Sequence, residues 1–186
     1  MRRICTLLGL GVLSALSVTR ADIIPSYVST VPSGPNSIVT YQADLTAEQN
    51  ANTGDFFTIY DFSSIMPTSS SQPSGWTFST SLVGPSPPQT NSPDNPSMWN
   101  LTWTYSGPTL SGTGIGPFTV TILGNSDVVS LETGYFAGQG TLIVGPNAGT
   151  HVGNVGRIPI PVVPEPSSVG LILAGLALSN CLWRKR

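Results

Sequence analysis

Three stretches of this chain alternate between large side chains and short polar ones. In residues 76–82, 99–105 and 118–122, apolar or aromatic residues occupy almost every second position, and Ser, Thr or Asn lies between them. Successive side chains of a strand point to opposite faces of a sheet, so this period of two predicts strands with one buried and one exposed face. The chain is therefore expected to fold mainly into β-sheet.

Further strands are expected where β-branched and aromatic residues cluster less regularly, over residues 38–43, 55–62, 128–132 and 135–144. The segments between them are rich in Pro and Gly and show no helical periodicity, which excludes parallel α/β folds because these need crossover helices. The pattern predicts an all-β fold, a single antiparallel β-sandwich or jelly-roll-like domain of about seven strands. This domain is expected over residues 22–144, with a Gly/Pro-rich linker over residues 145–163.

Charge is distributed unevenly along the chain. Six of the seven basic residues lie near the two ends, whereas residues 22–163 contain eight acidic residues and one base, Arg157, a net charge of −7. This balance excludes a nucleic-acid-binding surface. Both cysteines, Cys5 and Cys181, also lie near the ends, so residues 22–163 can form neither a disulfide framework nor a thiol active site.

The first 21 residues have the three parts of a secretory signal peptide. Arg2 and Arg3 precede an apolar run over residues 4–18, and a cleavage point follows between Ala21 and Asp22. The alternative is an uncleaved membrane helix, but this run of 15 residues is short of the roughly 20 that cross a bilayer core. We therefore expect signal peptidase to cut between Ala21 and Asp22.

The last 23 residues have a second three-part plan. They consist of the motif Pro164, Glu165 and Pro166, an apolar run over residues 169–183, and the basic tail Arg184, Lys185 and Arg186. At about 1.5 Å per residue a helix over the run spans roughly 22 Å, which makes it a marginal single transmembrane helix. The basic tail should stay on the cytoplasmic side and retain the helix in the membrane, with everything before the motif outside. An ordinary stop-transfer anchor would also have this hydropathy.

The order of these elements closely resembles the PEP-CTERM sorting signal of exported bacterial proteins, over residues 164–186. The resemblance implies recognition by an exosortase, a membrane-embedded cysteine transpeptidase found in bacteria that make exopolysaccharide. It implies a precursor anchored by the C-terminal helix and a mature protein at the cell surface or outside the cell, much as a GPI signal is removed. The two prolines suit such processing because they keep Glu165 in an extended backbone that cannot join the helix.

Residues 22–163 offer little catalytic chemistry. The one histidine, His151, is expected on the surface or in a loop, and no Gly-x-Ser-x-Gly nucleophile motif is present. Asp55 and Asp61 would lie about 20 Å apart in an extended strand, too distant to act together on a glycosidic bond. Asp55 follows Thr53 and Gly54 as a turn residue does, and a pairing of either aspartate with an acid elsewhere stays open. We expect no enzyme activity, no cofactor and no metal.

The predicted exposed faces are polar but nearly uncharged, since Ser and Thr account for 37 of the 142 residues from 22 to 163. Trp76, Trp99 and Trp103 occupy alternating strand positions and are expected in the core, whereas exposed rings would stack on sugars.

The sequence thus predicts an exported bacterial cell-envelope or extracellular-matrix protein of structural or adhesive type. A carbohydrate-binding module for exopolysaccharide is the first alternative, and a glycan-active hydrolase is the second. Expected partners are signal peptidase and exosortase during export, the membrane before processing, and exopolysaccharide or other matrix components. Nucleic acid is not an expected partner.

Overall fold

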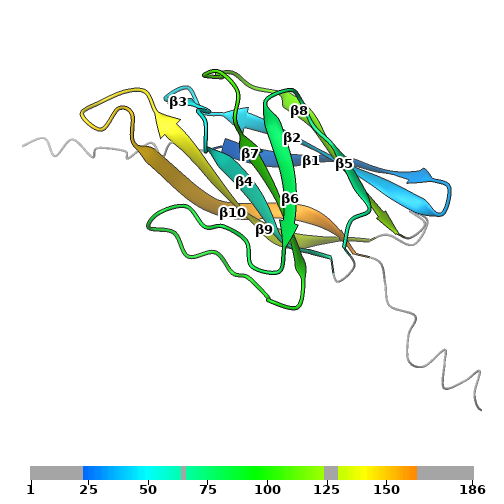
Figure 1. Ribbon diagram of the computed structural model, residues 1–186. Coiled ribbons are helices and arrows are strands. Elements are labelled where there is room, and N and C mark those ends of the chain that lie inside the picture. Colours follow the sequence, from blue (N-terminus) through cyan, green and yellow to red (C-terminus); the bar gives the residue numbers. More distant parts are fainter. Residues whose placement is uncertain (1–22, 64–65, 124–129, 163–186) are drawn as a thin grey trace, which may run out of the picture.

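The strands form two antiparallel sheets that pack face to face as a sandwich (Figure 1). The computed structural model describes residues 23–63, 66–123 and 130–162. Its strands are β1 (Ile23–Ser33), β2 (Asn36–Leu45), β3 (Gln49–Asn50), β4 (Phe56–Ser63), β5 (Ser69–Ser71), β6 (Trp76–Ser81), β7 (Trp99–Tyr105), β8 (Ile115–Leu123), β9 (Ser130–Leu142) and β10 (His151–Val162).

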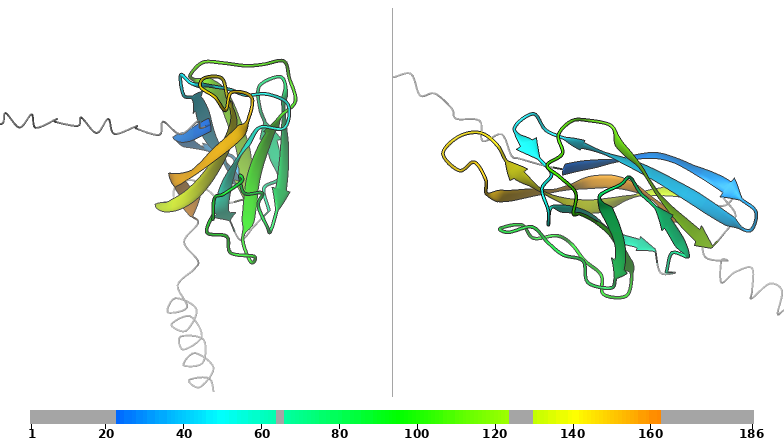
Figure 2. Two further views of the ribbon diagram at one scale, coloured as in Figure 1. Left: turned by 90° about the vertical axis from the view of Figure 1, so that its left-hand side faces the viewer. Right: turned by 45° about the horizontal axis from the view of Figure 1, so that its top comes forward.

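The small sheet has the strand order β1-β2-β8-β5, and the large sheet has the order β10-β9-β4-β7-β6, with β3 also paired to β9. The period of two in the sequence sets which side chains face inward. In β2 every second residue is buried, from Ser37 to Leu45, and in β8 the buried residues are Phe118, Val120 and Ile122. Each sheet therefore turns one face to the other sheet (Figure 2). The outer face of the large sheet is partly covered by the loop between β6 and β7, where the Tyr60 hydroxyl donates to the Pro85 carbonyl and the Tyr60 side chain is fully buried.

Aromatic rings fill the space between the sheets. Phe57 of β4 stacks on Trp103 of β7 with 5.0 Å between ring centroids, and it meets Phe118 of β8 edge-on at 4.9 Å. Trp76 of β6 meets the same Phe118 edge-on at 5.2 Å. Phe118 belongs to the small sheet and the other three rings to the large one, so these contacts join the two layers. Such pairs add about 0.5–1.5 kcal/mol each beyond the burial of their area.

The predicted antiparallel sandwich is confirmed, but the predicted number of strands is too low. The three alternating stretches form β6, β7 and β8, and the less regular runs fall in β2, β4 and β9, where two of them merge. The described residues contain ten strands. The two long strands that the sequence did not predict, β1 and β10, each contain two prolines, which are uncommon inside sheets.

The linker expected over residues 145–163 is wrong for most of its length. Residues 151–162 form β10, which pairs with β9 from His151 opposite Thr141 to Val162 opposite Ser130. The β10 side chains of Ile158 and Ile160 are only 1% and 5% exposed, because they pack into the core between the sheets. The folded domain therefore continues to Val162.

The prolines of β10 are accommodated because this strand forms an edge of the large sheet. The Tyr41 hydroxyl donates a hydrogen bond of 3.2 Å to the carbonyl of Pro159. The N–H and C=O of one strand residue point to the same side, so the position of the missing N–H of Pro159 also faces away from β9. No ladder hydrogen bond is lost there, which is the condition under which an edge strand tolerates proline.

Several predicted features lie outside the described residues. They are the peptidase site at Ala21 and Asp22, the motif Pro164, Glu165 and Pro166, the C-terminal helix, and the basic tail Arg184, Lys185 and Arg186. Among the residues that the structure describes, no helix is long and apolar enough to span a bilayer.

Candidate functional site

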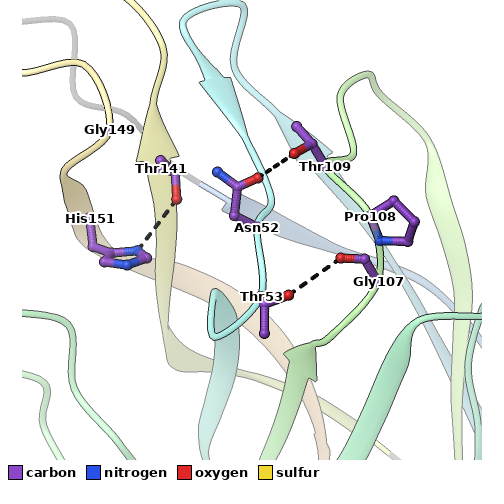
Figure 3. Close-up of a pocket in the computed structure, with 8 residues that line it drawn as sticks. All are labelled: Asn52, Thr53, Gly107, Pro108, Thr109, Thr141, Gly149 and His151. Carbon is purple, nitrogen blue, oxygen red and sulfur yellow. Dashed lines mark hydrogen bonds between the residues drawn. The ribbon is translucent and has the colours of Figure 1, made fainter.

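A polar pocket of about 500 Å³ opens at the end of the sandwich where β9 ends and β10 begins (Figure 3). Its lining residues are Asn52, Thr53, Gly107, Pro108, Thr109, Thr141, Gly149 and His151. Small-ligand sites commonly have volumes of about 300–1,000 Å³, so the pocket is large enough to hold a small ligand.

The first wall comes from the hairpin that joins β9 to β10. Thr141 near the end of β9 lies directly opposite His151, the first residue of β10. The connection between them turns through Gly145 and Gly149, whose positive φ angles of 75° and 89° are favourable only for glycine. The pairing of the two strands therefore fixes Thr141 and His151 side by side.

The opposite wall comes from two loops that hold each other in place. Ala51 and Leu110 exchange two backbone hydrogen bonds of 2.8 and 2.9 Å. Beside them the Thr109 hydroxyl donates to Asn52 Oδ1 at 2.8 Å. These bonds join the loop before β4 to the segment after β7, so the second wall is also built on strands.

A buried carboxylate links the pocket to the large sheet. Asp55, directly before β4, is fully buried, and its N–H bonds to the Asn52 carbonyl at 2.9 Å, which closes the expected turn. Its Oδ2 accepts hydrogen bonds from the Asn52 N–H at 2.8 Å and from the Thr141 hydroxyl at 2.7 Å. Its Oδ1 lies 2.8 Å from Nδ1 of His151. These three partners compensate for the loss of hydration of the carboxylate.

His151 lies at the surface, as expected, but it is the first residue of β10 and not part of a loop. Its side chain is 46% exposed at the pocket, and Nδ1 also lies 3.4 Å from the Thr141 hydroxyl. Among the described residues, Nε2 has no hydrogen-bond partner. An ionised Asp55 can only accept a hydrogen bond, so the Nδ1 that faces it donates, and Nε2 is left to bond to a ligand.

No protein-family model, curated protein or solved structure matches this chain. The chemistry of the pocket therefore follows from its own side chains.

The pocket brings together a histidine, an acid and a hydroxyl, but not in the order of a nucleophilic triad. In a triad, the histidine holds the acid through one ring nitrogen and takes the hydroxyl proton with the other. Here the Thr141 hydroxyl donates a hydrogen bond to Asp55. It lies on the Nδ1 side of the His151 ring, the side that also faces Asp55. Nε2 cannot activate that hydroxyl, so Thr141 is not placed as a nucleophile.

Asp61 belongs to a different hydrogen-bond network, which holds the loop between β6 and β7 against the end of β4. Its Oδ1 accepts the Asn95 N–H at 2.8 Å, and its own N–H donates to Asn100 Oδ1 at 2.8 Å. Asn100 in turn donates to Asp94 at 2.9 Å. Burial raises the pKa of Asp61, the Asn95 N–H lowers it, and the nearby Asp94 charge raises it further. Asp61 itself has a positive φ of 53°, which is a strained backbone conformation for a residue other than glycine.

Asp55 and Asp61 thus bind different partners, and neither is paired with another acid across the pocket, whose lining contains no Asp or Glu. Within residues 23–63, 66–123 and 130–162, no three His, Cys, Asp or Glu side chains gather where they could hold a metal ion.

The expected core positions of the tryptophans are confirmed for two of the three. Trp76 and Trp103 are 4% and 0% exposed, while Trp99 is partly buried. The two buried rings are unavailable for stacking on a sugar. Of the three tryptophans, only the partly buried Trp99 keeps part of its ring accessible.

Six of the eight pocket residues were not singled out from the sequence: Asn52, Gly107, Pro108, Thr109, Thr141 and Gly149. Thr141 and His151 meet through the register of β9 and β10, and Asn52 meets Thr109 across 57 positions of sequence. The available sequence signals were the turn before Asp55 and the presence of a single histidine, and neither indicates these contacts.

Proposed function

We propose that the protein is an exported bacterial cell-envelope or extracellular-matrix protein of structural or adhesive type, sorted by an exosortase through residues 164–186. The observation that carries this proposal is where the described strands begin and end. β1 begins at Ile23, directly after the predicted peptidase site at Asp22, and β10 ends at Val162, two residues before Pro164. In the sequence, every described strand therefore falls between the two expected signals.

These boundaries suit the removal of both segments. Ile23 is fully buried and pairs with Leu45, so a cut before Asp22 leaves this core residue in the mature protein. Val162 pairs with Ser130, so a cut near the sorting motif leaves β10 complete. Neither cut removes a described strand residue, so the sandwich can persist after processing.

The surface of the domain is compatible with a structural or adhesive role. Exposed strand residues bond to one another through hydroxyl groups, as Ser69 does with Thr121 at 2.9 Å and Thr77 with the Thr104 carbonyl at 3.2 Å. Such polar but weakly charged faces suit a hydrated matrix. The Thr141 hydroxyl lies on the Nδ1 side of His151 and not at Nε2, so this contact lends no support to the hydrolase alternative.

Replacement of Pro164, Glu165 and Pro166 by alanine tests the sorting step in a host that contains an exosortase. The matched control replaces the neighbouring Ser167 and Ser168 by alanine. We expect the first variant to keep its C-terminal segment and stay in the membrane fraction, and the control to be processed like the wild type. Mass spectrometry of the mature C-terminus distinguishes the forms. Normal processing of the first variant would show that the tail is an ordinary anchor and would reject the proposal.

A further inference from the structure

We propose that the pocket bordered by Asn52, Thr109 and His151 binds a neutral, polyhydroxylated ligand, namely a sugar residue of a polysaccharide. This inference rests on the adhesive role proposed above and gives that role a binding site. Three properties of the pocket support it: the polarity of its lining, its lack of charged side chains, and the arrangement of its hydrogen-bonding groups.

The polarity of the lining argues against an apolar ligand. Five of the eight lining residues carry a hydrogen-bonding side chain, and Pro108 is the only one with an apolar ring. An apolar ligand would remove water from these groups without replacing their hydrogen bonds, at a cost in affinity. The pocket therefore suits a ligand that is rich in hydrogen-bonding groups.

The charges argue against an ionic ligand. No Arg, Lys, Asp or Glu lines the pocket. Arg157, the only base in the described residues, lies over the Tyr135 ring, 5.9 Å from its centroid. An anion would find no Arg or Lys to pair with, in a domain whose net charge is negative, and the His151 ring of the lining is already paired with the Asp55 carboxylate. A cation would find no available carboxylate, because both oxygens of Asp55 are already bonded.

The hydrogen-bonding groups match hydroxyls that both donate and accept. Figure 3 shows His151 and Thr141 on one side of the pocket, Gly107 and Thr109 on the other, and Asn52 between them. Nε2 of His151 can form a hydrogen bond with a ligand hydroxyl, which serves as donor to a neutral ring and as acceptor for a protonated one. The Asn52 amide uses its oxygen on Thr109, and its NH₂ group has no partner among the described residues, so it can donate to a second hydroxyl. A sugar ring carries several hydroxyls that can serve both groups.

The pocket also lies where an extracellular polymer could reach it. His151 is the first and Val162 the last residue of β10, so the strand runs about 36 Å from the pocket toward the predicted sorting motif. Figures 1 and 2 show that the chain leaves the sandwich at the end opposite to the start of β10. If the tail is in the membrane, the pocket lies at the far end of the domain.

The test uses the full-length protein in a detergent without a sugar headgroup. Calorimetric titrations compare neutral hexasaccharides of glucan, mannan and galactan with an oligouronate of equal length and with inorganic phosphate. Amide NMR of the same samples locates the contacts. We expect at least one neutral sugar to bind and to shift the amides of residues 52, 53, 107, 109 and 149–151, and the two anions to bind more weakly.

Two matched threonine variants show whether the pocket is responsible. Thr109 and Thr77 are exposed threonines that each donate one hydrogen bond, but only Thr109 lines the pocket. Thr109→Val should weaken sugar binding about fivefold through the loss of hydrogen bonds on the pocket wall, while Thr77→Val should leave it unchanged.

Three results would overturn the inference: no binding by any neutral sugar to protein with a folded NMR spectrum, equal binding of the oligouronate, or equal effects of the two valine variants. Binding is measured on unprocessed protein, so its failure leaves the sorting proposal standing. Conversely, normal processing after alanine replacement of the sorting motif rejects that proposal and leaves the binding result unaffected.

Discussion

Asp55 joins three strands of the large sheet through its two carboxylate oxygens. It directly precedes β4, and it bonds to Thr141 of β9 and His151 of β10, which are 86 and 96 positions away in the sequence. A carboxylate with no exposed surface needs such partners, since an unpaired buried charge is strongly unfavourable. The same bonds orient the His151 ring, so Asp55 acts on the pocket through its neighbours.

Asp61 gives the domain a pH dependence of predictable sign. Burial raises its pKa above the usual value of about 3.9. A raised carboxyl pKa means that the folded state holds the proton more tightly than the unfolded state. Its contribution to stability is therefore full below about pH 3.9 and is lost as the pH rises through the folded-state pKa. The ionised group opposes folding at neutral pH.

Asp61→Asn should therefore raise the melting temperature near neutral pH and leave it unchanged at about pH 3, where the carboxyl of the wild type is protonated. Asparagine keeps an acceptor for the Asn95 N–H and tolerates the positive φ at this position. Thermal melts followed by circular dichroism measure the effect. Asp44→Asn is the control, because Asp44 also accepts one backbone N–H, that of Gly114, in an exposed position. An equal gain in both variants would reflect the negative charge of the whole domain and contradict the assignment to Asp61.

At the scale of elements, the local sequence predicts a strand when apolar and polar residues alternate along it. The alternation predicts β6, β7 and β8 correctly, although in β7 the polar Asn100 and Thr102 are buried as well. β10 was not predicted, because its Gly and Pro residues are typical of turns, and only its position at a sheet edge makes them acceptable. Edge position and register are properties of the assembled sheet. For the same reason the sequence indicated the turn at Asp55 but not its contacts with Thr141 and His151.

The burial of Ile158 provides a test of β10. Ile158 is 1% exposed and belongs to the core, whereas Ile143, in the turn after β9, is 44% exposed. Ile158→Ala should lower the free energy of unfolding by about 2–5 kcal/mol, because it leaves a cavity between the sheets. Ile143→Ala should change it by less than about 0.5 kcal/mol. Chemical denaturation measures both values, and two equally small effects would mean that residues 145–163 are a linker after all.

At the scale of the whole molecule, the start of β1 in the small sheet packs closely against β9 of the large sheet. A Cβ atom at Gly138 of β9 would lie 1.9 Å from the carbonyl oxygen of Ile23, so only glycine permits this approach. The contact fixes the start of β1 against the large sheet, three residues along β9 from Thr141 of the pocket. The described domain therefore has its first residue near the pocket and its last residue, Val162, at the opposite end (Figure 1).

Because the pocket and Val162 lie at opposite ends, the orientation of the domain on a membrane can be predicted. Only seven positions separate Val162 from the apolar run that starts at Val169, a reach of at most about 25 Å. Ser130 lies directly opposite Val162, whereas Thr150 precedes β10 at the pocket end, about 36 Å away along the strand. If residues 169–183 are inserted in a bilayer, Ser130 is therefore held closer to the lipid surface than Thr150.

Single dye labels can measure this difference, because residues 22–163 contain no cysteine. In full-length protein with Cys5 and Cys181 replaced by serine, Ser130→Cys and Thr150→Cys each provide one labelling site. After reconstitution into liposomes, energy transfer to an acceptor lipid should be higher from position 130 than from position 150. Removal of residues 164–186 is the control and should abolish transfer from both sites. Equal transfer from the two sites of the full-length chain would contradict an upright domain, because it would place the pocket as close to the membrane as the end from which the tail departs.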